Sequence, residues 1–110
     1  MSNSERILEF EIDHQRIVKK RDCDFSNIAP GTIGYLKAKF YFSPDGGWSD
    51  CKKAASFWID GVEYAQLLDA NDVCIIPSEA LVSDKFKVSV VGMKNGYKIT
   101  TNKTTVRQEG

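Results

Sequence analysis

The sequence predicts an all-β protein built as a two-sheet β-sandwich of about seven to eight antiparallel strands. Two observations lead to this class: short segments alternate between apolar and polar side chains, and turns rich in glycine, asparagine, aspartate and proline separate them. The chain has 110 residues, enough for one domain, and its 42% hydrophobic and 27% charged residues are typical of a globular protein. We therefore expect 1–110 to form a single domain, with flexible polar ends at 1–5 and 107–110.

Alternating side chains identify the strands of the first half. Leu8, Phe10 and Ile12 are separated by Glu9 and Glu11, which is the period of two expected of a half-buried strand. The amphipathic pattern favours antiparallel sheets with one wet face. The ranges expected to form strands in this half are 7–12, 15–19 and 33–42, with a loop at 21–32.

Turn residues delimit the strands of the second half. Asp60-Gly61 and Asn95-Gly96 are strong two-residue hairpin signals. Pro77 has no N–H group and should end a strand, and Ser78 is expected to cap one helical turn at 78–82. The ranges expected to form strands here are 54–59, 62–68, 73–76, 86–91 and 97–106. This number and spacing favour an immunoglobulin-like sandwich over the alternative, a small β-barrel.

Charge and cysteine content exclude several classes of function. Lysine plus arginine and aspartate plus glutamate each total 15, so the formal net charge is zero, which argues against nucleic acid and favours self-association. Cys23, Cys51 and Cys74 are widely spaced and form no zinc motif, so we expect reduced thiols in a cytosolic setting, with Cys74 buried. No apolar run approaches the ~20 residues of a membrane helix, so no membrane is expected as a partner.

No residue cluster in the sequence predicts catalysis, a cofactor or a metal. His14 is the single histidine, and we expect it to be an exposed turn residue rather than a catalytic base. The oxygen-rich segments 45–50 and 69–72 lack the spacing of a calcium loop and contain ordinary turn residues. We therefore predict no catalytic residue, no cofactor and no metal ligand.

Aromatic side chains form the candidate interaction surface. If Phe57 faces the core, strand alternation places Trp58 on the outside. An exposed tryptophan beside a tyrosine suits a protein interface or stacking on a sugar ring, whereas a core role is the alternative reading. The proposed surface consists of Trp48, Trp58, Tyr64, Tyr35 and Tyr41.

Residues 36–107 resemble, in order, a small domain of tailed bacteriophages and prophages. The segments that carry the resemblance are Ala65-Gln-Leu-Leu-Asp69, Cys74-Ile-Ile-Pro77, Glu79-Ala-Leu81, Phe86-Lys-Val-Ser-Val90, Gly92 and Ile99-Thr-Thr-Asn102. They are similar to immunoglobulin-like domains of minor structural, tail or baseplate proteins of phages from Gram-positive hosts. In such a sandwich, Leu81 would plug one end of the core and Gly92 would let its strand bend or bulge.

The resemblance implies a non-enzymatic virion structural protein of the tail, baseplate or capsid decoration. It would act through contacts with other virion proteins or with itself as a homo-oligomer, in the bacterial cytoplasm during assembly and then in the virion. It implies no catalytic residue. The alternative is a carbohydrate-binding module that assists adhesion to the host cell wall through Trp48 or Trp58. A third hypothesis is a small hydrolase built around His14.

Overall fold

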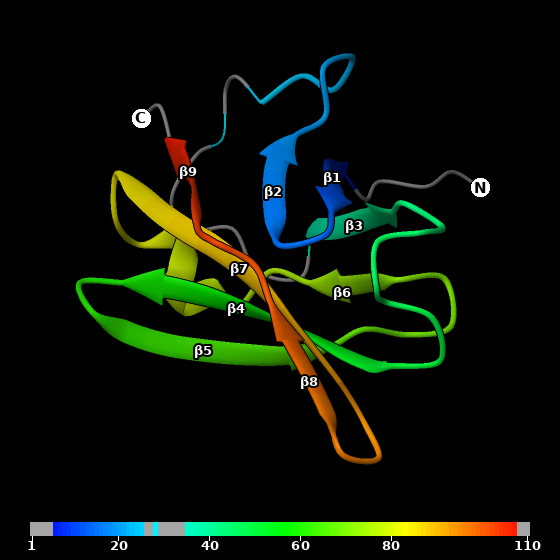
Figure 1. The fold of residues 1–110 in the computed structure, drawn as a ribbon. Coiled ribbons are helices and arrows are strands. Elements are labelled where there is room, and N and C mark those ends of the chain that lie inside the picture. Colours follow the sequence, from blue (N-terminus) through cyan, green and yellow to red (C-terminus); the bar gives the residue numbers. More distant parts are fainter. Residues whose placement is uncertain (1–5, 26–27, 29–34, 108–110) are drawn as a thin grey trace.

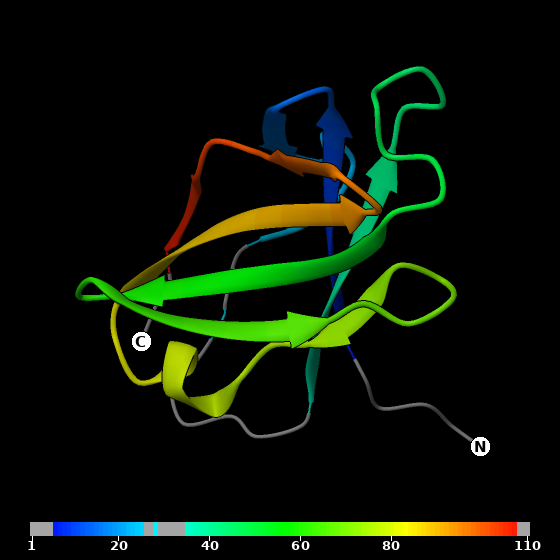
Figure 2. The same ribbon diagram turned by 60° about the horizontal axis from the view of Figure 1, so that its bottom comes forward.

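Two β-sheets pack face to face in the computed structural model, which describes residues 6–25, 28 and 35–107 (Figures 1 and 2). Within these residues there are nine strands and one 3-10 turn. In chain order they are β1 (Arg6–Asp13), β2 (Arg16–Lys19), β3 (Leu36–Phe42), β4 (Lys52–Ile59), β5 (Val62–Leu67), β6 (Val73–Ile75), η1 (Ser78–Leu81), β7 (Lys85–Lys94), β8 (Tyr97–Thr100) and β9 (Thr104–Arg107).

The predicted two-sheet sandwich is confirmed. Sheet A has the strand order β2-β1-β3-β6, and sheet B has the order β5-β4-β7-β8, with β9 also paired to β7. The two sheets are separate, unlike the single closed sheet of the β-barrel alternative. The Asp60-Gly61 hairpin is also confirmed, and both residues have the positive φ that this turn requires, 51° and 84°.

One strand pair differs from the antiparallel prediction, because β1 and β3 run parallel. After β2 the chain returns to the end of the sheet where β1 begins, and there the Arg6 N–H donates to the Tyr35 carbonyl oxygen at 2.9 Å. Side chains alternate in parallel and antiparallel strands alike, so the sequence pattern could not separate the two arrangements.

Alternating apolar side chains from both sheets form the core between the layers. The predicted inward residues of β1 are fully buried, and Phe10 stacks on Phe40 of β3 with ring centroids 5.3 Å apart. Phe57 and Phe86 of sheet B point into the same core, and the centroids of their two rings are 6.1 Å from each other. The other fully buried large side chains are Trp48, Leu8, Ile12, Ile28, Leu36, Ile76, Leu81 and Val88.

Trp48 belongs to this core, which corrects its prediction as a surface residue. Its side chain is 2% exposed, and its Nε1–H donates to the His14 carbonyl oxygen at 2.8 Å. The ring lies against Phe42, at 5.0 Å between centroids, and against the backbone of Gly92. A Cβ atom at Gly92 would lie 2.8 Å from two carbons of the indole ring. Gly92 is therefore required for close packing.

The bulge expected at Gly92 of β7 lies instead in the segment that pairs with β7, between β8 and β9. Gly92 keeps regular register with both β4 and β8. Between the pairs Val91–Thr100 and Val88–Thr104, the three residues 101–103 oppose the two residues 89–90, so one residue is extra. This bulge divides the single strand predicted at 97–106 into β8 and β9.

The bulge also connects the two sheets. Asn102 turns toward β2, where its Oδ1 accepts a hydrogen bond from the Ile17 N–H at 3.0 Å. The Asn102 N–H donates to the Gln15 carbonyl oxygen at 2.9 Å. These two hydrogen bonds close the side of the sandwich where β2 and β9 meet. In Figure 1 the segment between β8 and β9 passes beside the β1–β2 turn.

The helical turn predicted at 78–82 is confirmed as η1, although its cap differs. Pro77 occupies the N-cap position and no side chain makes a capping hydrogen bond, so the predicted capping role of Ser78 is wrong. Leu81 is fully buried against sheet B, as expected of a residue that closes one end of the core. Within the described ranges no helix is long enough to cross a membrane.

The predicted flexible ends fall mainly outside the described residues, as does half of the loop predicted at 21–32. Arg107 is the exception, because it pairs with Lys85 as the last residue of β9. It is therefore part of the sheet and not of a tail.

We predict that Gly92→Ala lowers the free energy of unfolding by about 1–3 kcal/mol, because the added methyl group overlaps the Trp48 ring. Urea denaturation followed by circular dichroism measures the change. The matched test is Gly92→Ala combined with Trp48→Phe, whose losses should be less than additive because the smaller ring leaves room for the methyl group. Fully additive losses would contradict the proposed contact.

Candidate protein-contact site

The predicted aromatic surface is not assembled in the structure. Trp48 is in the core, and Tyr64 is half-buried and packs against it from β5. Tyr35 precedes β3, and Tyr41 projects from the outer face of sheet A. Trp58 lies on the outer face of sheet B, as predicted from the burial of Phe57, so these side chains share no common face.

Lysine side chains lie over the rings of Trp58 and Tyr41 on the outer faces of the two sheets. The Nζ atom of Lys103 is 3.8 Å from the Trp58 ring centroid, and the Trp58 Nε1–H donates to Ser89 Oγ at 2.9 Å. Lys20 and Lys39 lie 5.8 and 5.3 Å from the Tyr41 ring centroid. Stacking on a sugar requires an open ring face, so this arrangement does not favour the carbohydrate-binding alternative.

The outer face of sheet A carries both charged and apolar side chains: Ile7 and Ile75, which are 44% and 46% exposed, lie on it together with lysine and glutamate residues. Glu9 pairs across the strands with Lys39, and its Oε2 accepts a 2.5 Å hydrogen bond from the Tyr41 hydroxyl group. That hydrogen bond stabilises the protonated phenol and raises the pKa of Tyr41 above its ordinary value. Lys37 lies between Ile7 and Ile75 in one row across the strands, so apolar and charged side chains alternate on this face.

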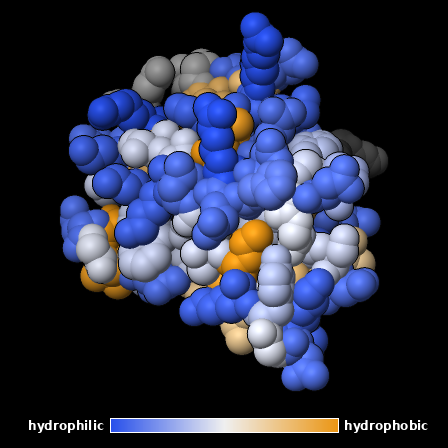
Figure 3. Space-filling model, viewed as in Figure 1, coloured by the Kyte–Doolittle hydropathy of each residue, from blue (hydrophilic) through white to orange (hydrophobic). Residues whose placement is uncertain are grey.

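The outer face of sheet B carries a contiguous apolar patch, formed by Ala54, Leu67, Val91 and Met93. Leu67, Ala54 and Val91 lie in one row across β5, β4 and β7, and Met93 follows on the same face of β7. Leu67 is 78% exposed and Met93 54% exposed. In contrast, on the face shown in Figure 3 hydrophobic side chains reach the surface as small spots among hydrophilic ones.

The apolar patch lines a shallow open groove of about 590 Å³. Its rim carries charges of both signs from Asp50, Lys52 and Lys94, together with the amide of Asn95. Lys94 is held in place because its Nζ donates to the Ser49 carbonyl oxygen at 3.0 Å. An apolar floor with a polar rim is the common anatomy of protein contact sites.

The sequence contained a signal for this patch that the aromatic search missed. Along β7 the outward residues change from polar to apolar, and in order they are Lys85, Lys87, Ser89, Val91 and Met93. The cross-strand neighbours that extend the apolar end of this row into a patch depend on sheet register, which the sequence does not show.

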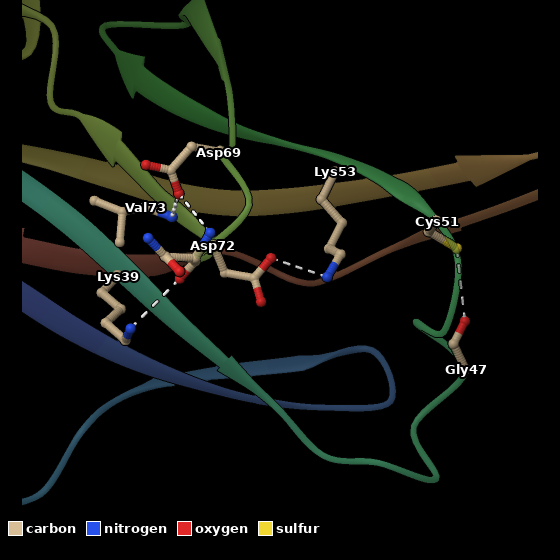
Figure 4. A network of polar contacts seen from close by, with 8 residues as sticks. Lys39, Gly47, Cys51, Lys53, Asp69, Asp72 and Val73 are labelled. Atoms are coloured by element: carbon tan, nitrogen blue, oxygen red, sulfur yellow. Dashed lines mark hydrogen bonds and ion pairs between the residues drawn. The ribbon is translucent and has the colours of Figure 1, made fainter.

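The acidic turn at 69–72 uses its oxygen atoms for its own backbone and for two lysines (Figure 4). Asp69 Oδ1 accepts hydrogen bonds from the N–H groups of Asn71 and Val73 at 2.8 and 3.1 Å. Asp72 Oδ1 lies 2.9 Å from Lys53 Nζ. In the described part of the chain, no three histidine, cysteine or acidic side chains are grouped to hold a metal ion.

His14 lies in the β1–β2 turn with a φ of 56° and is exposed. Asp13 Oδ1 is 2.7 Å from His14 Nδ1 and 3.1 Å from Ser43 Oγ. These hydrogen bonds, with the bond from His14 as the largest effect, stabilise the carboxylate and hold the pKa of Asp13 below its ordinary value. In a catalytic triad the histidine lies between serine and aspartate, whereas here the aspartate occupies the middle.

The three cysteines are free thiols in different environments. Cys23 and Cys51 are partly exposed, and the Cys23 Sγ accepts the Glu9 N–H at 3.3 Å. Cys74 is 7% exposed, as expected from the sequence. Burial, with a smaller effect from the charge of Asp69, raises the pKa of Cys74 to about 12. Its thiol is therefore held protonated and out of reach.

We predict that maleimide at mildly alkaline pH modifies Cys23 and Cys51 while Cys74 stays unmodified, because the reactive species is an accessible thiolate. Mass spectrometry of peptides after timed labelling measures each site. In urea all three thiols should react at similar rates, which serves as the control. Labelling of Cys74 in the folded protein as fast as Cys51 would contradict the described burial.

Comparisons of the chain with models of known protein families, with curated proteins and with solved structures find no match.

Proposed function

We propose that this protein is a non-enzymatic structural component of a bacteriophage or prophage virion, in the tail, baseplate or capsid decoration. It acts through protein–protein contacts. The observation that carries the contact function is the apolar patch on the outer face of sheet B. The virion assignment is supported by the resemblance of residues 36–107 to immunoglobulin-like phage domains.

Burial of the apolar patch would provide the free energy of binding. Apolar surface contributes about 25 cal/mol for each Å² removed from water, and contiguous exposed patches on folded domains mark contact sites. Leu67 and Met93 are the most exposed members and therefore gain most from a partner. The rim residues Asp50, Lys52 and Lys94 would set the orientation of that partner through charge.

The charge pattern favours an assembly role over nucleic-acid packaging. The formal net charge is zero, and two of the lysines lie against acidic or aromatic groups, in the pairs Lys53–Asp72 and Lys103–Trp58. A protein that binds phosphates in number needs a local cationic excess. A chain with balanced charge and an exposed apolar patch instead suits contact between folded proteins.

We predict that the chain is present in purified particles induced from the bacterial strain that encodes it, and that Met93→Glu lowers its incorporation severalfold because a charge enters the apolar patch. Quantitative mass spectrometry of gradient-purified particles measures incorporation.

The matched control is Val82→Glu, which places the same charge at a 71% exposed valine outside the patch and should leave incorporation unchanged. Particles that lack the wild-type chain would contradict the virion role. Equal loss with both variants would contradict the role of the patch.

A further inference from the structure

The four lateral edges of the sandwich differ in how they are protected from pairing. Edge strands usually avoid other chains through lysine, proline, short length or coverage. The β2 edge carries Arg16 and Lys19 and is bonded to Asn102. In sheet B, one edge is formed by β8 and β9. There β8 carries Lys98, β9 carries Arg107, and a bulge separates the two strands. The last strand of sheet A, β6, has only three residues.

The β5 edge has none of these protections. It is a regular six-residue strand, Val62–Leu67, with no lysine, arginine or proline and with Glu63 as its one charged residue. Among the described strands, β5 pairs with β4 alone. Its exposed residues include Val62 and Leu67, so the edge is both unpaired and partly apolar.

The register shows which backbone groups of β5 face outward. The Leu68 N–H donates to the Lys53 carbonyl oxygen at 2.9 Å, so this pair is hydrogen-bonded. Hydrogen-bonded and non-bonded pairs alternate in an antiparallel ladder. The N–H and C=O groups of Glu63, Ala65 and Leu67 therefore point away from β4 and toward the free edge.

We propose that β5 pairs antiparallel with β5 of a second copy of this chain, around a two-fold axis through Ala65. This inference rests on the proposed contact function and names its first partner. The backbone N–H and C=O groups of residues 63, 65 and 67 point to the free edge and are spaced symmetrically about Ala65. In the dimer these groups of one copy would therefore bond to the same set of groups in the other copy. Each Glu63 then lies opposite Leu67 of the second copy, and the edge is self-complementary, as a two-fold interface requires.

The side chains of β5 favour this partner and this direction. Ala65 on the axis allows the two backbones to approach without steric conflict, and its neighbours in the row are the small residues Ser56 and Ser89. Antiparallel pairing about Ala65 keeps the two Glu63 carboxylates at opposite ends of the interface. An in-register parallel pairing would set them side by side, which is unfavourable. The zero net charge of the chain adds no long-range repulsion between copies.

Such a dimer would also enlarge the candidate contact site. The axis is perpendicular to sheet B, so both apolar patches would lie on the same face of one continuous sheet. The methylene groups of Glu63 would cover part of Leu67 of the second copy, which is 78% exposed in the single chain. A further virion protein would then meet two equivalent patches on one surface.

Sedimentation velocity over a concentration series tests the proposal on the purified full chain. We expect the wild type to form a concentration-dependent dimer. Ala65→Pro should weaken dimerisation at least about tenfold, because it removes an N–H that faces the free edge while the β4 ladder does not use that group. Ala65→Ser keeps the N–H and should still dimerise. Leu67→Lys, a second variant that leaves the backbone unchanged, should also weaken the dimer through edge charge.

Amide hydrogen exchange locates the interface. The amides of Glu63, Ala65 and Leu67 should be protected at high concentration and exchange rapidly after dilution, whereas Tyr64 and Gln66, bonded to β4, should stay protected in both conditions. A wild type that is monomeric at all concentrations would overturn the proposal. So would a dimer that leaves the three edge amides unprotected, or one that Ala65→Pro and Leu67→Lys do not weaken.

The two proposals fail separately. A chain that dimerises through β5 but is absent from particles would refute the virion role alone. A monomeric chain that is incorporated into particles would refute self-pairing alone.

Discussion

The burial of Trp48 against Gly92 is the contact on which much of the sandwich depends. Trp48 lies on the connection between β3 of sheet A and β4 of sheet B, and its ring fills the space between Phe42 and the backbone of β7. Its indole N–H also satisfies the carbonyl oxygen of His14 in the β1–β2 turn. One side chain thus joins the two sheets, a long connection and a turn. Its position requires a residue without a side chain at Gly92.

The hydrogen bonds of Asn102 provide a second connection between the sheets. They join the sheets at one side of the sandwich only, so the two sides differ. On the side of β2 and β9, the bulge at 101–103 directs Asn102 onto β2 and satisfies the backbone there. On the other side, the acidic turn at 69–72 leads the chain from β5 to β6 but leaves the outer edge of β5 unpaired. The protein therefore has one closed side and one open side. The proposed contacts with other chains are at the open side.

The two outer faces differ for a related reason. In sheet A, parallel pairing of β1 with β3 places Glu9 beside Lys39, and Tyr41 donates a hydrogen bond to Glu9 while its ring lies against Lys39 Nζ. In sheet B, the register of β5, β4 and β7 collects apolar side chains beside the open edge. The patch and the edge meet at Leu67. A single surface can thus provide both backbone hydrogen bonds and apolar area to a partner.

The sequence by itself determined where most strands lie, which side chains face inward and where the Asp60-Gly61 hairpin turns. These features are local, because alternation and turn conformations depend on residues a few positions apart. The tertiary structure alone decided that β1 and β3 are parallel, that residues 97–106 divide into two strands and that Trp48 is buried. It also decided that Ala54, Leu67, Val91 and Met93 form one apolar patch, whereas the predicted aromatic residues share no common face. Each of these features depends on which distant segments pair and in what register, and an alternating pattern is compatible with many such pairings.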